Sequence, residues 1–444
     1  MDKFLFGVAT AATQIEGGYN QDGKGLTIWD DYSAKGLIQN GVTCFRACDS
    51  YNRLEEDLAY LEKLGVNSYR FSIAWSRIQP KGYGEINPKG IEYYNRLIDG
   101  LLKRGIKPMV TLFHWDLPLG LSEKGGFANH EIVDHFREYA KIVAENFGDR
   151  VELFSVFNEA QALIDFLFLR PVGDGYPPFS TQKTFEGIHN LLLANAAATY
   201  ALREYSKNKV QVGMVNCTHC YIPTEDGIED VIRKEMFKPN DTLFCNTTFW
   251  DPVFFGKYDE ELIKKQGVDL SFVKDGEMEY IKCVPDFLGL NIYIGHRVKL
   301  GADGKLVPTT PDINSNFGDM WGDYMNTADA MYYGPKYMQE RYGKPVYITE
   351  NGCTLSEFLI DGKVEDQVRG EYIRRYLTRL IKAKDEGLDI RGYYAWSLMD
   401  NFEWSSGFTR RFGLIYVDFE TCERTPKSSF YKYQELIQSY RKAK

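Results

Sequence analysis

Several features that would place this 444-residue chain in a special class are scarce or missing. Its eight cysteines are too dilute for a disulfide framework. No apolar stretch reaches the roughly 18 residues of a membrane-spanning helix, and no long run of Lys and Arg occurs. Acidic residues outnumber basic ones 62 to 53, which gives a formal net charge of −9. The composition therefore argues against binding to nucleic acid or to an anionic membrane.

The chain also lacks the marks of an internal domain boundary. No segment rich in Pro, Gly or Ser and no low-complexity tract divides it. At a typical length of roughly 150 residues per domain, the chain would contain about three domains, but α/β barrels of this size form a single domain. We therefore expect residues 1–444 to form a single catalytic domain.

The first residues resemble a weak secretory signal, with Lys3 before an apolar stretch over Phe4–Ala12. However, Asp2 cancels the charge of Lys3, and Gly7 and Thr10 interrupt the stretch. A buried first strand explains the segment better, because cleavage would remove that strand. This predicts a cytoplasmic protein and leaves export by another route open.

Two short motifs are compatible with a cofactor, and both are weak. Cys217-Thr-His-Cys220 has a metal-like spacing, but no second ligand pair lies nearby. It ends an apolar run, where cysteines more often pack as small apolar residues. The segment Gly18–Lys24 is close to a phosphate-binding loop, but Gly25 stands where such loops need Ser or Thr. We predict neither a metal nor a cofactor.

The chain does have a regular alternation of short apolar runs and amphipathic stretches. The runs predict eight strands: Phe4–Thr10, Val66–Phe71, Pro108–Phe113, Leu153–Phe157, Val210–Val215, Phe287–Leu290, Val346–Thr349 and Gly392–Trp396. Helix-like segments between them include Ser50–Leu64, Lys89–Arg104, His130–Phe147, Thr184–Tyr205, Asp366–Glu386 and Ser429–Ala443. In the first helical segment, Leu54, Leu58, Leu61 and Leu64 recur at helical spacing.

Eight strands alternating with helices predict a parallel sheet of the α/β class. Such units close into a single (β/α)8 barrel, or TIM barrel, here with long βα loops. The alternative is a doubly wound sheet, which would normally carry a GxGxxG turn after an early strand. No such turn occurs in this sequence. The barrel is therefore the predicted fold, with its chemistry at the carboxyl ends of the strands.

Polar and aromatic residues follow seven of the eight predicted strands. They are Gln14 and Glu16, Arg70, His114-Trp115-Asp116, Asn158-Glu159, Asn291 with Tyr293, Glu350-Asn351, and Trp396. Each has an ordinary explanation by itself, such as a helix-capping carboxylate for Glu159 or a rim ion pair for Arg70. Because the strand ends of a barrel meet at one face, we expect all seven clusters to form one pocket.

A pocket with two carboxylates, an Arg and several aromatics suits the cleavage of a glycosidic bond. Two carboxylates from separate strands can act as nucleophile and proton donor. An Arg and a Tyr keep one of them ionised, and that charge raises the pKa of the other. Indole rings pack on the apolar faces of a sugar, and polar side chains match its hydroxyls. This is the two-carboxylate arrangement of glycoside hydrolysis.

Ordered motifs extend this interpretation along the chain. They are Phe6–Thr10 with Gln14–Gly17, Tyr69–Arg77, Phe113–Pro118, Phe157–Glu159, Ile348–Gly352 and Trp396–Trp404. With these motifs the sequence resembles glycoside hydrolase family 1, the β-glucosidase family with a (β/α)8 barrel, over essentially its whole length.

The resemblance implies a role for each matching residue. Glu159, in the Asn-Glu motif, would be the acid/base, and Glu350, in the Thr-Glu-Asn-Gly motif, would be the nucleophile. Arg70 and Tyr293 would contact the nucleophile. The predicted sugar-binding residues are Gln14, His114, Trp115, Asn158, Asn291, Glu403 and Trp404, with Trp396 as the stacking floor and Trp321 as a platform for a second sugar.

The sequence departs from the family pattern beside Glu159. Ala160 stands where the family usually has Pro, and Gln161 where an aromatic is common. Ala keeps a backbone N–H and does not fix φ, so we expect a looser turn around Glu159. The usual Asn-Tyr-Tyr motif of the family appears here as Asn291-Ile292-Tyr293, so the first Tyr is replaced by Ile and the second is kept.

The resemblance implies a retaining, exo-acting β-glucosidase that removes terminal β-D-glucosyl residues from neutral β-glucosides and cello-oligosaccharides. Some β-galactosidase or β-fucosidase activity and a role in cellulose degradation are expected with it. A branch of the family that hydrolyses 6-phosphosugars has a Ser where Glu403 stands, so we expect phosphorylated sugars to be excluded. A catalytically silent sugar-binding protein, a transglycosidase and a homo-oligomer stay open.

Overall fold

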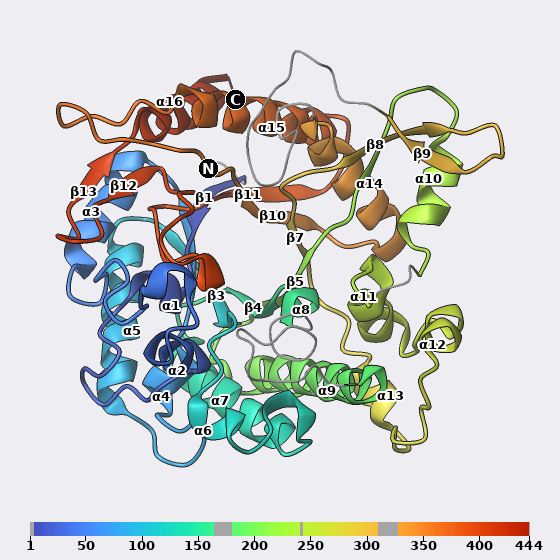
Figure 1. Ribbon diagram of the computed structural model, residues 1–444, viewed down its shortest axis with the longest axis horizontal. Coiled ribbons are helices and arrows are strands. Elements are labelled where there is room, and N and C mark those ends of the chain that lie inside the picture. The colour runs from blue at the N-terminus through green and yellow to red at the C-terminus, as the bar shows by residue number, and fades with distance from the viewer. Residues whose placement is uncertain (1–3, 164–179, 240–242, 310–326, 444) are drawn as a thin grey trace.

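The structure is a computed structural model that describes residues 4–163, 180–239, 243–309 and 327–443. Its centre is a closed barrel of eight parallel strands, which helices surround (Figure 1). In order around the barrel the strands are β1 (Leu5–Ala9), β2 (Ser68–Ser72), β3 (Lys107–Phe113), β4 (Leu153–Asn158), β5 (Gln211–Cys217), β7 (Leu288–Asn291), β10 (Val346–Asn351) and β11 (Ile390–Trp396). The predicted TIM barrel is confirmed, and each predicted apolar run contributes one barrel strand.

The first strand closes the barrel, as its apolar composition predicted. All five residues of β1 are buried, and the strand pairs with β2 on one side and with β11 on the other. Gly7 is required at the β11 contact, because a Cβ at this position would lie 2.3 Å from the ring of Tyr394. The segment therefore forms an integral part of the barrel.

The main helices pack around the strands. They are α3 (Leu54–Leu64), α5 (Pro88–Lys103), α7 (Ile132–Phe147), α9 (Thr181–Tyr205), α14 (Ala330–Tyr342), α15 (Gln367–Asp385) and α16 (Ser428–Ala443). Local sequence fixes their ends: Asn87 caps α5 with Pro88 in its first turn, and Gly65 ends α3 with φ of 79°. The leucines of α3 predicted to face the core are buried.

Long βα loops carry further short elements. The helices are α1 (Ala12–Ile15), α2 (Ile28–Ala34), α4 (Trp75–Ile78), α6 (Leu119–Ser122), α8 (Ala160–Leu163), α10 (Glu229–Met236), α11 (Asn246–Phe255), α12 (Glu260–Gln266) and α13 (Glu277–Ile281), with 3-10 turns η1 (Gln39–Gly41), η2 (Gly126–Ala128) and η5 (Trp404–Ser406). Two small sheets contain β6 (Tyr221–Pro223), β8 (His296–Leu300) and β9 (Leu306–Pro308), and β12 (Ile415–Val417) and β13 (Arg424–Pro426). No helix in the described part of the chain has the length and apolarity needed to cross a bilayer.

A buried charge cluster anchors the loop that follows β11. Asp400 of this loop accepts from Lys427 Nζ at 2.7 Å and from the Gly413 N–H at 3.0 Å. The other members of the cluster are Glu357, Asp366, Arg369 and Arg411. The charges of three acidic and three basic side chains thus balance one another beneath the segment that leads to residues 403 and 404.

Candidate active site

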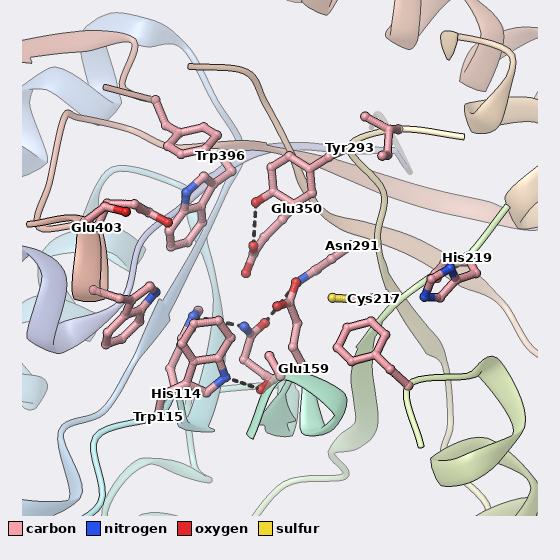
Figure 2. Close-up of a pocket in the computed structure, with 18 of the residues that line it drawn as sticks. His114, Trp115, Glu159, Cys217, His219, Asn291, Tyr293, Glu350, Trp396 and Glu403 are labelled. Carbon is pink, nitrogen blue, oxygen red and sulfur yellow. Dashed lines mark hydrogen bonds between the residues drawn. The ribbon is translucent and has the colours of Figure 1, made fainter. Parts of the chain in front are cut away.

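Glu350 lies at the carboxyl end of β10 between two hydrogen-bond donors, of which Figure 2 shows Tyr293. Arg70 Nη1, from β2, donates to Oε1 at 2.6 Å, and the Tyr293 hydroxyl donates to Oε2 at 2.7 Å. Both Arg70 and Glu350 are buried, so solvent screens their attraction little. Burial raises the pKa of Tyr293 well above its ordinary value, and the charge of Glu350 adds to this. Tyr293 therefore keeps its proton as a donor.

Glu159 enters the same cavity from the end of β4 and has different partners. Asn291 Nδ2 donates to its Oε1 at 2.7 Å and also to Asn158 Oδ1 at 3.2 Å. Asn158 Oδ1 in turn accepts from Arg70 Nη2 at 2.6 Å. Arg70 thus contacts the Glu350 carboxylate directly and is linked to the Glu159 carboxyl through the amides of Asn158 and Asn291.

The turn that carries Glu159 is anchored by backbone donors. Glu159 has φ of 46°, a left-handed conformation uncommon for a residue with a Cβ, and its N–H donates to Val215 O at 2.8 Å. The Ala160 N–H donates to Asn216 Oδ1 at 3.2 Å, a bond that Pro could not make. Gln161 is buried and donates to Cys217 O at 3.0 Å. Ala160 therefore adds an anchor to this turn, where the sequence comparison predicted a looser one.

The different surroundings separate the proton affinities of the two carboxyls. Burial and the charge of Glu350 raise the pKa of Glu159 to about 7. Burial also raises the pKa of Glu350, but the charge and hydrogen bonds of Arg70 and the Tyr293 hydroxyl oppose this rise. When the pair carries one proton, that proton therefore resides on Glu159.

Aromatic rings and a third carboxyl form another wall of the cavity. Trp396 and Trp404 line it, and the His114 ring is stacked on both at centroid distances of 5.7 and 5.8 Å. Glu403 lies beside Trp396 (Figure 2) and accepts from Gln14 Nε2 at 3.1 Å. Burial, followed by the charge of Glu350, raises the pKa of Glu403 to about 8.

His114, in this wall of the cavity, is a neutral imidazole. Burial and the nearby Arg70 charge hold its pKa well below the ordinary value. Asn158 Nδ2 lies 3.0 Å from His114 Nε2, so Nε2 is the acceptor and the ring proton is on Nδ1. Trp115, next in sequence, has φ of 72° and donates from its indole to Asn158 O at 2.9 Å. Trp115 therefore also fixes the neighbour of Glu159.

Some residues in the strand-end clusters lie outside the cavity wall. Glu16 pairs with Arg77 and accepts from the Tyr94 hydroxyl at 2.6 Å, a buried structural ion pair. Asp116 is fully buried, and burial raises its pKa to about 7. Gln14 lies behind Glu403, and Trp321 falls outside the described residues.

The cavity has a volume of about 580 Å³, and part of its wall has no counterpart in the predicted residue set. This outer part extends away from the carboxyl pair. It includes Thr218, His219, Phe244 and His296, while Cys217 and Phe412 line the cavity nearer to Glu159 and Tyr293. Thr218 and His219 follow β5, and their position just after a barrel strand was the one sequence signal for them. The described residues contain no cluster of three or more His, Cys, Asp or Glu side chains arranged for a metal ion.

Comparisons with known proteins agree with this geometry. The model of Glycosyl hydrolase family 1 matches residues 1–442. Beta-glucosidase A of Thermotoga maritima is 40% identical, with 98% of this chain and 97% of that protein aligned. A 6-phospho-beta-galactosidase of Clostridium acetobutylicum is 35% identical, with coverages of 99% and 97%. The solved beta-glucosidase from Thermotoga maritima in complex with glucoimidazole superposes with a TM-score of 0.87 at 38% identity, covering 99% of this chain and 98% of that one.

A closed (β/α)8 barrel with two buried carboxyls and a tryptophan-lined cavity at its strand ends defines a glycosidase of the barrel class. The chain belongs to glycosyl hydrolase family 1, as its ordered motifs predicted.

Proposed function

We propose that residues 1–444 form a single catalytic domain that acts as a retaining, exo-acting β-glucosidase on neutral β-glucosides. The observation that carries this proposal is the unequal environment of Glu159 and Glu350 within one cavity. Glu350 faces a cation and a phenol, whereas Glu159 faces neutral groups. The relatives described above support glucose as the terminal sugar.

In the first half of the reaction, Glu350 attacks the anomeric carbon with one carboxylate oxygen. The bond from that carbon to the glycosidic oxygen breaks, and the oxygen takes the Glu159 proton as the alcohol departs. The product is a glycosyl ester of Glu350. Arg70 and Tyr293 contact both oxygens of Glu350 and orient it for this attack.

In the second half, Glu159 acts as a base. Esterification removes the negative charge of Glu350, which had raised the pKa of Glu159, so Glu159 is now a carboxylate. It takes a proton from water as the water oxygen attacks the anomeric carbon. The ester bond breaks, Glu350 returns as a carboxylate, and the two inversions together retain the β configuration.

The remaining wall would bind the terminal sugar. Glu403 would accept from two sugar hydroxyls, and the neutral His114 would donate from Nδ1. Trp396 and Trp404 offer apolar faces to the ring. The inner part of the cavity would hold the terminal sugar, and the outer part, lined by His219, Phe244 and His296, would hold the aglycone.

Cello-oligosaccharides fit this arrangement as substrates, and their breakdown in the cytoplasm is part of the proposal. The test is a panel of p-nitrophenyl β-glycosides with the wild type and Glu350→Ala as the inactive control. We expect β-glucoside hydrolysis to be fastest, with β-fucoside and β-galactoside next. Binding of glucosides without any turnover would contradict the proposal, and mainly transferred products at low alcohol concentration would favour a transglycosidase.

A further inference from the structure

Cys217 differs from the other cysteines in its surroundings. The other seven are buried, whereas Cys217, at the end of β5, is partly exposed; it lines the cavity together with Cys220. Strand register explains this place, because Cys217 pairs with Asn291 at the end of β7, and Glu159 donates its N–H to Val215 on the strand that carries Cys217. The sequence interpretation as a small packing residue therefore holds for Cys220 and not for Cys217.

The Cys217 side chain interacts with the Glu159 carboxyl. Figure 2 shows its sulfur beside that carboxyl, and the interaction between the two side chains lowers the pKa of Glu159. Burial raises the pKa of the thiol well above its ordinary value, and the charge of Glu159 adds to this, so the sulfur keeps its proton. A protonated thiol donates to a carboxylate. Glu159 therefore lies between the Asn291 amide from β7, which donates to it, and the neutral Cys217 thiol from β5, which carries a proton that it can donate.

We propose that Cys217 is a positioning residue for the reaction, whose S–H group, together with the Asn291 amide, holds the Glu159 carboxyl toward the glycosidic oxygen. The inference rests on the proposed acid/base role of Glu159. Cys217 transfers no proton to the substrate and acts only through its contact with Glu159. In the first half of the reaction this contact keeps the Glu159 carboxyl directed at the glycosidic oxygen, and in the second half at the attacking water.

The contact has a pH signature because it favours the charged form of Glu159. A donor to the carboxylate lowers its pKa, and the Cys217 contact acts in this direction. The other charged or titratable groups that act on or with Glu159 are Glu350, Arg70, Tyr293 and Glu403. Loss of the thiol leaves these groups in place. Glu159 would then hold its proton to higher pH, and the alkaline limb of kcat/KM would move upward by about 0.5 pH unit, the effect of one weak hydrogen bond.

The experiment compares Cys217→Ala, which removes the donor, with Cys217→Ser, which keeps one. Cys283→Ala is the matched control, because Cys283 is a buried cysteine outside the cavity lining that accepts from Asn195 at 3.4 Å. The readouts are the alkaline apparent pKa of kcat/KM and the kcat for glucosides with poor and activated leaving groups. Thermal unfolding of each variant confirms that it is folded. Cys217→Val, which also lacks a donor, replaces Cys217→Ala should the latter not fold.

We expect the alkaline pKa of Cys217→Ala to rise by about 0.5 unit, and that of Cys217→Ser to stay at or below the wild-type value. The kcat of Cys217→Ala should fall several-fold with a poor leaving group and change less with an activated one. Cys283→Ala should keep the wild-type profile. An alkaline limb at the same pH in wild type, Cys217→Ala and Cys217→Ser would overturn the inference. A Glu159→Gln variant separates failure of the acid/base role from failure of the Cys217 role. Full activity of Glu159→Gln would refute the acid/base role of Glu159. Its inactivity, together with unchanged pH profiles of the Cys217 variants, would refute only the role of Cys217.

Discussion

Arg70 Nη1 lies 2.6 Å from Oε1 of Glu350 in a buried contact between the ends of β2 and β10. The guanidinium also contacts Asn158, the residue before Glu159, so one cation organises both carboxyl groups. It stabilises charge on Glu350 and leaves Glu159 among neutral donors. The proposed division into nucleophile and acid/base depends on this asymmetry.

The first prediction concerns stereochemistry. We expect the carboxyl groups of Glu159 and Glu350 to be separated by about 5–5.5 Å, the spacing of retaining enzymes. A water molecule does not fit between the sugar and Glu350 at that spacing, so the carboxylate itself must attack. Proton NMR of a reaction in progress should show β-glucose before mutarotation. Initial release of α-glucose would contradict the mechanism.

Removal of the acid should affect substrates according to their leaving group. Glu159→Ala should lose roughly 10²–10⁴-fold in rate with a poor leaving group. Activated aryl glucosides should be hydrolysed much better, because their leaving groups depart without a proton. Azide should restore part of the rate and yield β-glucosyl azide. Glu152→Ala, which removes an exposed carboxylate just before the same strand, serves as a control, and equal losses on both substrate types would argue against the acid role.

The pH profile should reflect the two carboxyls. Activity requires a protonated Glu159, whose pKa is raised to about 7, so kcat/KM should fall as pH rises through that value. It also requires an ionised Glu350, whose pKa burial raises, so activity should fall on the acid side as well. The check is kcat/KM for an aryl glucoside between pH 4 and 10. Glu159→Gln should remove the alkaline limb, and an alkaline limb that survives this change belongs to another group.

Discrimination against a 6-phosphate should increase with pH. Glu403 is neutral below its raised pKa of about 8 and charged above it, so repulsion of a phosphate grows as pH rises through 8. Nearby Arg410 offsets part of this repulsion. We expect kcat/KM for the neutral aryl glucoside to exceed that for its 6-phosphate by roughly 10²–10³-fold at high pH.

The paired measurement uses the wild type and Glu403→Ser at pH 6 and pH 9. The variant should lose activity on the neutral sugar and show little pH dependence of the ratio. Comparable kcat/KM for the two substrates in the wild type would overturn the assignment of neutral sugars, and it would bring this chain nearer to its 6-phospho-beta-galactosidase relative.

The charge cluster beneath the active-site loop predicts a stability effect. Lys427 is fully buried and contacts both Asp400 and Glu357. Lys427→Met leaves three buried acidic groups facing two basic ones, so the free energy of unfolding should fall by about 3–5 kcal/mol. Lys432→Met, in helix α16 that begins after Lys427, removes a partly exposed ion pair with Glu435 and should cost about 0–1 kcal/mol. Equal effects in urea unfolding would show that the cluster is not stabilising.

Local composition determined the barrel strands and the helices between them. Apolar runs such as Leu153–Phe157 cannot be exposed, and the leucines of α3 recur at helical spacing, so each element was predictable without knowledge of its partners. The ordered motifs likewise pointed to Glu159 and Glu350, because a catalytic group must follow a barrel strand. The sequence also suggested that Arg70 and Tyr293 lie beside Glu350.

Only the tertiary structure decided which strand-end groups share the cavity. Glu16 and Glu159 both follow strands, but Glu16 pairs with Arg77 in the protein interior. Cys217 ends an apolar run, so the sequence predicted a small packing residue. The register of β5 against β7 instead brings its side chain beside the Glu159 carboxyl. These outcomes depend on contacts between segments more than 50 residues apart, and on burial, which sets each pKa. No single segment contains that information, because register and burial are properties of the closed barrel.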